Sequence, residues 1–533
     1  MEKRALLAVV LSILILILYQ EWVSRRYVPP PSPPPEKVTE KAPAPSPQRL
    51  PKAEEVKAAR TAEPQTVGEI RVETDRYLAI FTNQGGRLKS FALKNYRASS
   101  AEKSPPFEMV PSMPGVPYPL GVELSGPKPF NDEGILYAVE GKDLKLTGDA
   151  RGTLVFRGRT PTGAVLVKKF TFTGTAYPIE VEIAAENADG ASPPAVLVTS
   201  GGNQQEHDAK FEGLLALVNN KIRRESADEI QKAIELKGPV SWAGFGYTYF
   251  LFSLLPQGNG EYQLSARQAG PALVMKMQRP AAGNASGTDR FTLFIGPKDL
   301  EILKSLGKGL ERSIDFGYFA FVSIPLLYVM HFSHRFTASY GIDIIVLTIL
   351  IKLLLAPLTH KSFVSMKQMQ KLQPQMERMR ERFKDDREKL NKEIMELYRR
   401  NKVNPLGGCL PMVLQFPVFI GLYNALLTPI ELRHASFLWI KDLSRPDWES
   451  LPFTLGGWSL GIPVLTLLMG ASMFVQQWMT PSAGDPNQRR MMMMMPVVFT
   501  AMFVTFPAGL TIYWLVNNIL TIAQQYLINR MDR

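Results

Sequence analysis

A lysine inside a long apolar stretch is the residue whose position most strongly suggests chemistry in this sequence. Residues 340–359 read YGIDIIVLTILIKLLLAPLT, and a helix of that length spans roughly 30 Å, one hydrocarbon thickness. Lys352 lies roughly 18 Å from its start. A cation at that depth costs a few kcal/mol, so we expect it to face protein or a water-filled cavity. The alternative is that the lysine stem extends to nearby headgroups.

Other polar side chains fall on matching faces of apolar segments. Thr348 lies one turn before Lys352 and Thr359 two turns after it. Gln415 lies in the middle of a later segment, and the last segment has Tyr513, Asn517 and Thr521 on one face, followed by Gln524. These residues could line one hydrophilic groove, although each alone is more often an interhelical hydrogen-bonding group. The later apolar segments contain no Asp or Glu to pair with Lys352.

Composition excludes several classes of protein. The 533 residues have a net charge of +12, from 61 Lys+Arg against 49 Asp+Glu. This charge concentrates beside apolar segments, which indicates membrane orientation and anionic lipids as partners, with no direct nucleic-acid binding. A lone cysteine, Cys409, and five scattered histidines predict no metal site, and the sequence has no phosphate-binding P-loop. We therefore expect no cofactor.

The N-terminal residues predict a membrane anchor followed by a tether. Lys3 and Arg4 precede the apolar run ALLAVVLSILILILY, which resembles a signal peptide, but no small-residue cleavage site follows. An uncleaved anchor is the better interpretation. Residues 29–66 contain eleven prolines, which are typical of an extended linker.

Residues 67–298 alternate apolar and polar side chains in many short runs separated by turn residues, which predicts a large antiparallel β-sandwich. We expect one helical insert at 221–236. The only histidine of this region, His207, lies in a polar loop, so no acid–base constellation is visible. We therefore do not expect an enzyme.

Two further segments have helical patterns. Residues 299–339 are amphipathic and suit helices in the headgroup plane, with soluble packing helices as the alternative. Residues 360–404 predict a basic, cytoplasmic two-helix hairpin whose second helix begins at Asp385, with Glu388 at capping-box spacing. Its apolar stripe could be ordinary hairpin core or an adaptable contact surface for partners; it comprises Met366, Met369, Met376, Met379 and Phe383.

The expected fold is a polytopic α-helical membrane protein with six transmembrane helices, a large periplasmic antiparallel β-sandwich and a cytoplasmic helical hairpin. Both termini would be cytoplasmic. In chain order the expected segments are an anchor (1–28), linker (29–66), β-sandwich (67–298), interfacial helices (299–339), second transmembrane helix (340–359), hairpin (360–404), third transmembrane helix (405–428), periplasmic loop (429–453), fourth transmembrane helix (454–479), cytoplasmic loop (480–490), fifth (491–507) and sixth (508–528) transmembrane helices, and tail (529–533).

Long stretches of the C-terminal half resemble one known family. They run from APLTHKSFVSMKQMQ through NPLGGCLPMVLQFPVFIGLYNAL (356–426), continue with ELRHASFLWIKDLS (431–444), and end with DPNQRRMMMMMPVVFT and FPAGLTIYWLVNNILTIAQQ. These residues resemble the Gram-negative branch of the YidC/Oxa/Alb membrane-insertase family. The resemblance implies a β-supersandwich outside the membrane and, within the bilayer, a hydrophilic groove that has one positive charge, usually an arginine.

The resemblance also implies roles for individual residues. Lys352 stands at the position of the usual arginine, and it keeps the charge without the bidentate guanidinium. Thr348, Gln415 and Tyr513 match groove positions. Trp514 replaces a second aromatic residue that is usually tyrosine, and Asn517 joins this set through its helical face.

The implied function is insertion of nascent membrane proteins, alone or with the Sec translocon. The ribosome and the signal recognition particle receptor are further candidate partners; relatives often have a longer basic tail, whereas this sequence ends at Arg533, so ribosome binding through a tail is not expected. One rival function is secondary transport of an anionic solute by Lys352, against which the sequence shows no inverted repeat. The other is an envelope enzyme acting through the β domain.

Overall fold

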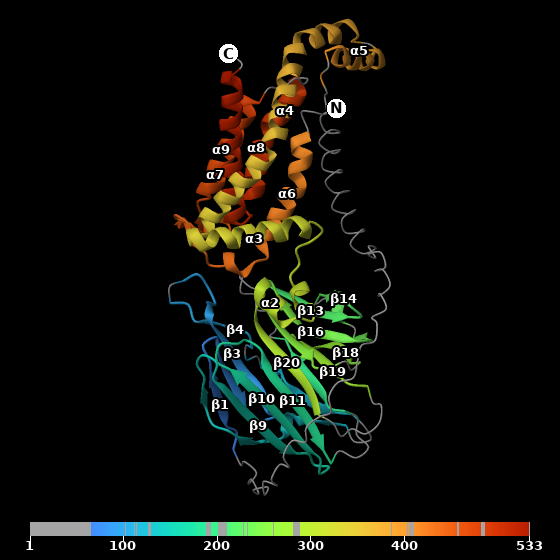
Figure 1. The fold of residues 1–533 in the computed structure, drawn as a ribbon, viewed down its shortest axis with the longest axis vertical. Helices are drawn as coiled ribbons and strands as arrows, with labels where there is room; N and C mark the ends of the chain where they lie inside the picture. The colour runs from blue at the N-terminus through green and yellow to red at the C-terminus, as the bar shows by residue number, and fades with distance from the viewer. Residues whose placement is uncertain are drawn as a thin grey trace, which may run out of the picture. The chain divides into compact units, whose positions relative to one another are not determined.

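The structure is a computed structural model (Figure 1), and it describes residues 66–531 with gaps at 102, 111, 113, 126–128, 188–192, 201–209, 227–228, 232, 259–260, 281–287, 385, 402, 404–409, 456–457 and 481–485. The predictions for the anchor, for all but the last residue of the linker, for His207, for Asp385 and for Cys409 lie outside the described residues.

The first half of the described chain is built of β-strands. They are β1 (Glu69–Glu73), β2 (Tyr77–Thr82), β3 (Arg87–Arg97), β4 (Pro106–Glu108), β5 (Gly121–Leu124), β6 (Phe130–Asn131), β7 (Ala138–Glu140), β8 (Leu144–Lys145), β9 (Arg151–Arg159), β10 (Val165–Thr173), β11 (Ile179–Glu186), β12 (Ala195–Thr199), β13 (Phe211–Val218), β14 (Lys221–Glu225), β15 (Ile234–Leu236), β16 (Val240–Tyr247), β17 (Phe250–Pro256), β18 (Gln263–Ala269), β19 (Ala272–Gln278) and β20 (Thr288–Pro297).

These strands form three sheets. The sheet orders are β4-β3-β2-β1-β8, β14-β13-β16-β17-β20-β11-β10-β9-β7 and β15-β18-β19-β12-β5-β6. Among the described strands, pairing is antiparallel except for the short parallel contact of β1 with β8. Phe81 of β2 meets Phe156 of β9 and Phe170 of β10, with ring centroids 6.0 and 5.0 Å away. The five- and nine-stranded sheets therefore pack face to face, as a sandwich requires.

The helical insert predicted at 221–236 is wrong. β14 pairs with β13 and β15 pairs with β18, with a short 3₁₀ turn (Glu229–Gln231) between them. The reason is the turn Asn219-Asn220: both residues have positive φ, 51° and 57°, and Val218 pairs with Lys221 across them. A two-residue loop with two left-handed residues forces a tight hairpin, which asparagine tolerates well.

The second half of the chain is helical. Its helices are α2 (Leu300–Leu306), α3 (Ala320–Thr337), α4 (Tyr340–Arg382), α5 (Arg387–Arg400), α6 (Leu410–Leu427), α7 (Val464–Met479), α8 (Pro486–Phe503) and α9 (Ala508–Met531), with 3₁₀ turns η3 (Leu310–Ser313), η5 (Ile430–Leu432) and η6 (Asp447–Ser450). Helix α2 ends at Leu306, because Gly307 has a positive φ of 69°. Helix α3 lies across α4 and α6 (Figure 1).

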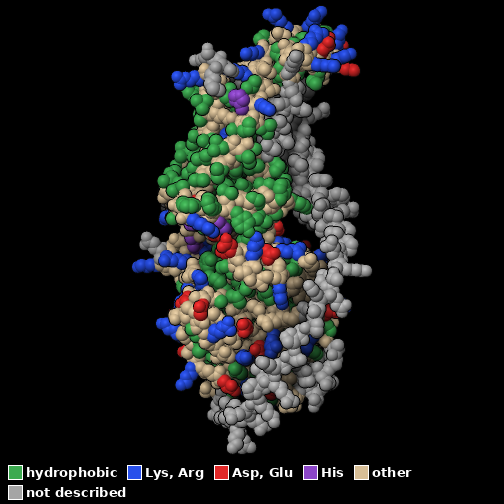
Figure 2. Space-filling view, in the orientation of Figure 1, with side chains coloured by type: hydrophobic (Ala, Val, Ile, Leu, Met, Phe, Trp, Pro, Cys, Tyr) green, Lys and Arg blue, Asp and Glu red, His purple; other side chains and the backbone are tan. Residues whose placement is uncertain are grey.

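Helix α4 continues without a break through the predicted boundary at 359/360. Its 43 residues contain both the apolar stretch with Lys352 and the first arm of the hairpin. Among the described helices, α4 alone is long and apolar enough to cross a membrane; shorter apolar stretches occupy α6 (Gln415–Leu427), α7 and α8 (Met491–Phe503). Figure 2 shows hydrophobic side chains gathered over these helices, and Lys and Arg side chains at the α4–α5 hairpin.

Helix α7 begins about ten residues later than predicted. The stretch assigned to the start of the fourth transmembrane helix instead forms a hairpin of β21 (Pro452–Leu455) and β22 (Trp458–Gly461). Gly461 packs against the Trp448 carbonyl so closely that an added Cβ would lie 2.0 Å from that oxygen. Pro463 then precedes the first helical residue, where a proline before the first turn is well tolerated.

Candidate functional site

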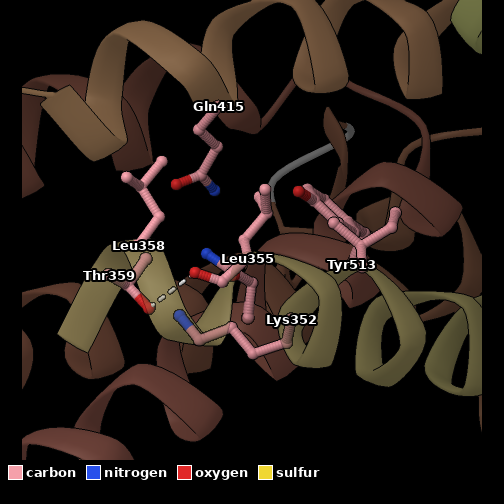
Figure 3. Close-up of a pocket in the computed structure, with 8 residues that line it drawn as sticks. Lys352, Leu355, Leu358, Thr359, Gln415 and Tyr513 are labelled. Carbon is pink, nitrogen blue, oxygen red and sulfur yellow. Dashed lines mark hydrogen bonds between the residues drawn. The ribbon is translucent and has the colours of Figure 1, made fainter. Parts of the chain in front are cut away.

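The polar residues predicted to form a groove meet in a small pocket between α4, α6 and α9. Lys352, Gln415, Tyr513 and Asn517 all line it. Figure 3 shows Gln415 reaching in from α6 on the side opposite Lys352 and Thr359 of α4. Sequence reasoning missed the apolar part of the lining, although helical spacing from Lys352 could have indicated it; those residues are Ile351, Leu355 and Leu358.

The Lys352 ammonium is held by a neutral hydroxyl of the facing helix. Its Nζ donates to Thr521 Oγ1 at 2.6 Å, joining α4 to α9. Within the described part of the chain, no carboxylate lies within 4 Å of this nitrogen. The lysine stem therefore turns toward protein, which favours the cavity-facing interpretation over extension to headgroups.

Asp343, the acidic residue nearest to Lys352 in its own helix, is committed elsewhere. Its fully buried carboxylate accepts from Ser333 Oγ and Thr337 Oγ1, both at 2.6 Å, and lies 2.7 Å from His334 Nδ1. All three partners belong to α3. Asp343 thus joins α3 to the start of α4 and does not pair with Lys352, whose ammonium has no carboxylate partner among the described residues.

Thr521 and Gln524 do not line the pocket themselves but hydrogen-bond to Lys352 and Thr359, which do. Thr348 and Trp514 also lie outside its lining. Thr348 is 1% exposed and donates its hydroxyl to the Ile344 carbonyl of its own helix at 2.6 Å. Trp514 packs among aromatic rings, with centroids 5.1 Å from both Phe419 and Phe503. Both residues support helix packing in this conformation, because helical proximity to Lys352 or Tyr513 does not by itself decide which side a residue faces.

The pocket is small and polar on one side. It has about 10 Å³ of room for the centre of a water molecule, so it holds about one water. Around that space the charged Lys352, the amides of Gln415 and Asn517 and the Tyr513 hydroxyl can hydrogen-bond a polar guest. This chemistry suits transient binding of a carboxylate or a peptide group.

In the structure, α4 and α5 pack together along part of the predicted Met stripe. Met369 and Met376 of α4 are buried against Leu397 and Tyr398 of α5, and Met366 and Met379 lie at the edge of this cluster. Phe383 is not part of it and lies beside two cations, Arg382 and Lys389. Helix α5 is capped by Asp386, whose side chain accepts from the Lys389 amide.

Comparison with known proteins covers nearly the whole chain. Residues 69–329 match the family described as YidC periplasmic domain, and residues 332–533 match the family described as 60Kd inner membrane protein. The chain is 40% identical to the membrane protein insertase YidC of Syntrophus aciditrophicus, over 99% of this chain and 100% of that protein. It is also 40% identical to the YidC of Pelobacter propionicus, over 100% of this chain and 99% of that protein.

The chain also matches a solved structure of an active YidC insertase with its first transmembrane domain resolved. The match covers 86% of this chain and 92% of the chain in that structure. The sequence identity is 19% and the TM-score 0.38.

The matched families define an inner membrane protein with a periplasmic β domain. With relatives this similar over their full length, the chain belongs to the YidC family of membrane protein insertases. An insertase family is not an enzyme class.

Proposed function

We propose that this protein inserts membrane proteins by receiving hydrophilic segments of nascent chains in the pocket around Lys352. The observation that supports this most directly is the uncompensated ammonium, which donates to a hydroxyl and has no carboxylate partner in the described residues. In a low dielectric such a charge attracts acidic residues of a translocating segment strongly. The apolar part of the substrate would then leave sideways into lipid.

The proposed topology follows the sequence. Six transmembrane helices would leave both termini and the α4–α5 hairpin in the cytoplasm and the β domain in the periplasm. The Met-lined hairpin, with its basic outer faces, would receive emerging substrate and contact anionic lipids. The Sec translocon would be a partner for larger substrates, and the ribosome and the signal recognition particle receptor are candidates on the cytoplasmic side.

The pocket dimensions add a requirement to this mechanism. Space for about one water cannot hold a polypeptide segment. A substrate must therefore replace the contacts between α4, α6 and α9, and the polar side chains that it separates would then hydrogen-bond to the substrate. Because the substrate's polar groups bond to these side chains in place of water, moving a hydrophilic segment part of the way across the bilayer costs less free energy.

The test is complementation in cells depleted of their own insertase. Lys352→Arg, Lys352→Ala and Lys352→Glu are compared with the unaltered chain, and insertion of an acidic-tailed substrate is followed by protease accessibility. We expect Arg to work, Ala to insert at least about fivefold more slowly, since a charge pair of this kind is worth about 1–4 kcal/mol, and Glu to be slowest.

Lys361→Ala provides the matched control, because Lys361 is exposed on the same helix and does not line the pocket. Equal insertion by all Lys352 variants would refute the role of the charge. Uptake of an anionic solute into proteoliposomes, abolished by Lys352→Ala, would instead favour a transporter.

A further inference from the structure

We infer that Thr521 is a positioning residue for insertion: its neutral hydroxyl aims the Lys352 ammonium into the pocket without cancelling its charge. This inference rests on the proposed function, because it explains how a flexible lysine can act as the groove cation. Thr521 is 6% exposed and comes from α9, the helix that faces α4 across the pocket.

The hydrogen bonds of Thr521 assign its proton. The hydroxyl donates to the Asn517 carbonyl of its own helix at 2.6 Å. Having used its one proton, the oxygen can only accept from Lys352 Nζ, also at 2.6 Å. An ammonium has three protons, so two remain for pocket water or for an incoming acidic group.

A second contact between α9 and α4, one helical turn after Thr521, fixes the position of the Thr521 hydroxyl. Gln524 Nε2 donates to Thr359 Oγ1 at 3.0 Å and approaches the Ala356 carbonyl at 3.4 Å. Thr359 and Ala356 belong to α4, so the two helices are tied both at Lys352 and about one turn beyond it. The Thr521 oxygen is thereby held in register with the lysine instead of depending on one bond.

The need for such a residue follows from the chemistry of lysine. A lysine is a point charge on a flexible stem, whereas the planar guanidinium of arginine is pre-organised and loses less freedom for each hydrogen bond that it forms. A neutral acceptor can orient the stem at little cost to the charge. A carboxylate at the same place would orient it equally well, but would pair with it and leave little attraction for substrate.

Three substitutions of Thr521 in the full-length protein separate orientation of the lysine from cancellation of its charge. Thr521→Ser keeps the acceptor and should insert an acidic-tailed substrate normally. Thr521→Val has nearly the same shape and no acceptor, and should slow that substrate about three- to tenfold while a neutral-tailed version is unaffected. Thr521→Asp should abolish the preference for the acidic tail, as Lys352→Ala does. In a Lys352→Arg background, Thr521→Val should have a much smaller effect.

Thr511→Val is the matched control, since Thr511 is a fully buried threonine of α9 whose hydroxyl donates to the Pro507 carbonyl of its own helix turn and, among the described residues, does not contact Lys352. Steady-state level and thermal unfolding in detergent identify any variant that fails to fold, and in that case the serine variant and the arginine background still decide the question. Equal slowing of acidic and neutral substrates by Thr521→Val, or no slowing at all while Lys352→Ala remains defective, would overturn the positioning role. No defect in Lys352→Ala would instead refute the proposed function itself.

Discussion

A second buried lysine, in the β domain, is used in the opposite way from Lys352. The alternation along β10 points Lys168 into the core together with Leu166, Phe170 and Phe172, and it is fully buried. Lys168 Nζ lies 2.6 Å from Asp132 Oδ2 and donates to the carbonyls of Gly85 and Leu120 at 2.6 and 2.7 Å. Burial lowers the pKa of Lys168 to about 8, and Asp132 opposes that shift.

Asp132 also pairs with Arg87, whose Nη2 lies 3.2 Å from Asp132 Oδ1, so one carboxylate balances two buried cations. Asp132→Asn should destabilise the β domain by about 3 kcal/mol, because removing one partner of a buried ion pair leaves charge unpaired. Hydrogen exchange of the β3 and β10 amides in the full-length protein measures this free energy of opening.

Adding Lys168→Met to Asp132→Asn should recover part of the loss, since it removes one of the two orphaned cations. Glu140→Gln, which breaks the exposed ion pair with Arg157, should leave the exchange rates unchanged. If Asp132→Asn behaved like Glu140→Gln, the cluster would not stabilise the fold.

The two lysines also show what residue types predict. Lys352 was predictable because a charge in an apolar stretch must find a polar site, and the structure places Gln415, Tyr513 and Asn517 with it. Thr348 and Trp514 were not predictable, because rotation of neighbouring helices decides which side chains face the pocket. Lys168 has the period of a core residue, but its partner lies 36 positions earlier, and a single sequence does not reveal such pairs.

At the scale of elements, long periodic patterns predicted the structure well and short ones did not. The alternating runs of 67–298 became strands, and the Met stripe became the core of the hairpin. The errors fell where turn geometry overrides composition: Asn219-Asn220 turned an expected helix into β14, and the hairpin before Pro463 replaced the first turns of α7. Residues with a positive φ, or a φ fixed by a proline ring, decide the ends of such elements more strongly than mean hydropathy does.

Helix α3, which we place outside the transmembrane segments, has an attachment that should depend on pH. His331 Nε2 lies 3.0 Å from Glu431 Oε1 of η5, and this contact raises the pKa of His331, with smaller contributions from Asp299 and Glu301. A raised histidine pKa means that the contact stabilises the fold fully below about pH 6.5. The stabilisation is lost as pH rises through the folded-state pKa.

We therefore expect the α3 amides to exchange faster with solvent at pH 8.5 than at pH 6, after correction for intrinsic exchange rates. Glu431→Gln should remove this difference by making the low-pH protein resemble the high-pH one. Glu311→Gln is the control, because Glu311 does not contact His331. A pH dependence that persists in Glu431→Gln would assign it to another group.

At the scale of the whole molecule, Arg433 connects the β sheets to the helical part. It follows η5, and its guanidinium carbon lies 5.3 Å from the ring centroid of Phe107 (β4) and 5.5 Å from that of Phe250 (β17). Its Nη2 donates to the carbonyls of Arg97 and Ala98 at 2.8 and 3.2 Å. With the side chain only 8% exposed, a cation–π contact of this kind is worth about 2 kcal/mol.

Arg433→Ala should loosen this connection without unfolding either part, since the sheets and the helices each keep their own packing. After replacement of Cys409 by serine, spin labels at Ser100 and Phe336, both exposed, should give a broader distance distribution in the variant. Arg433→Lys should give an intermediate width, because it keeps the charge and loses the planar guanidinium that stacks on both rings. An unchanged distribution in Arg433→Ala would mean that the linker through α2 and η3 suffices to hold the β domain, and that Arg433 only fills a gap between Phe107 and Phe250.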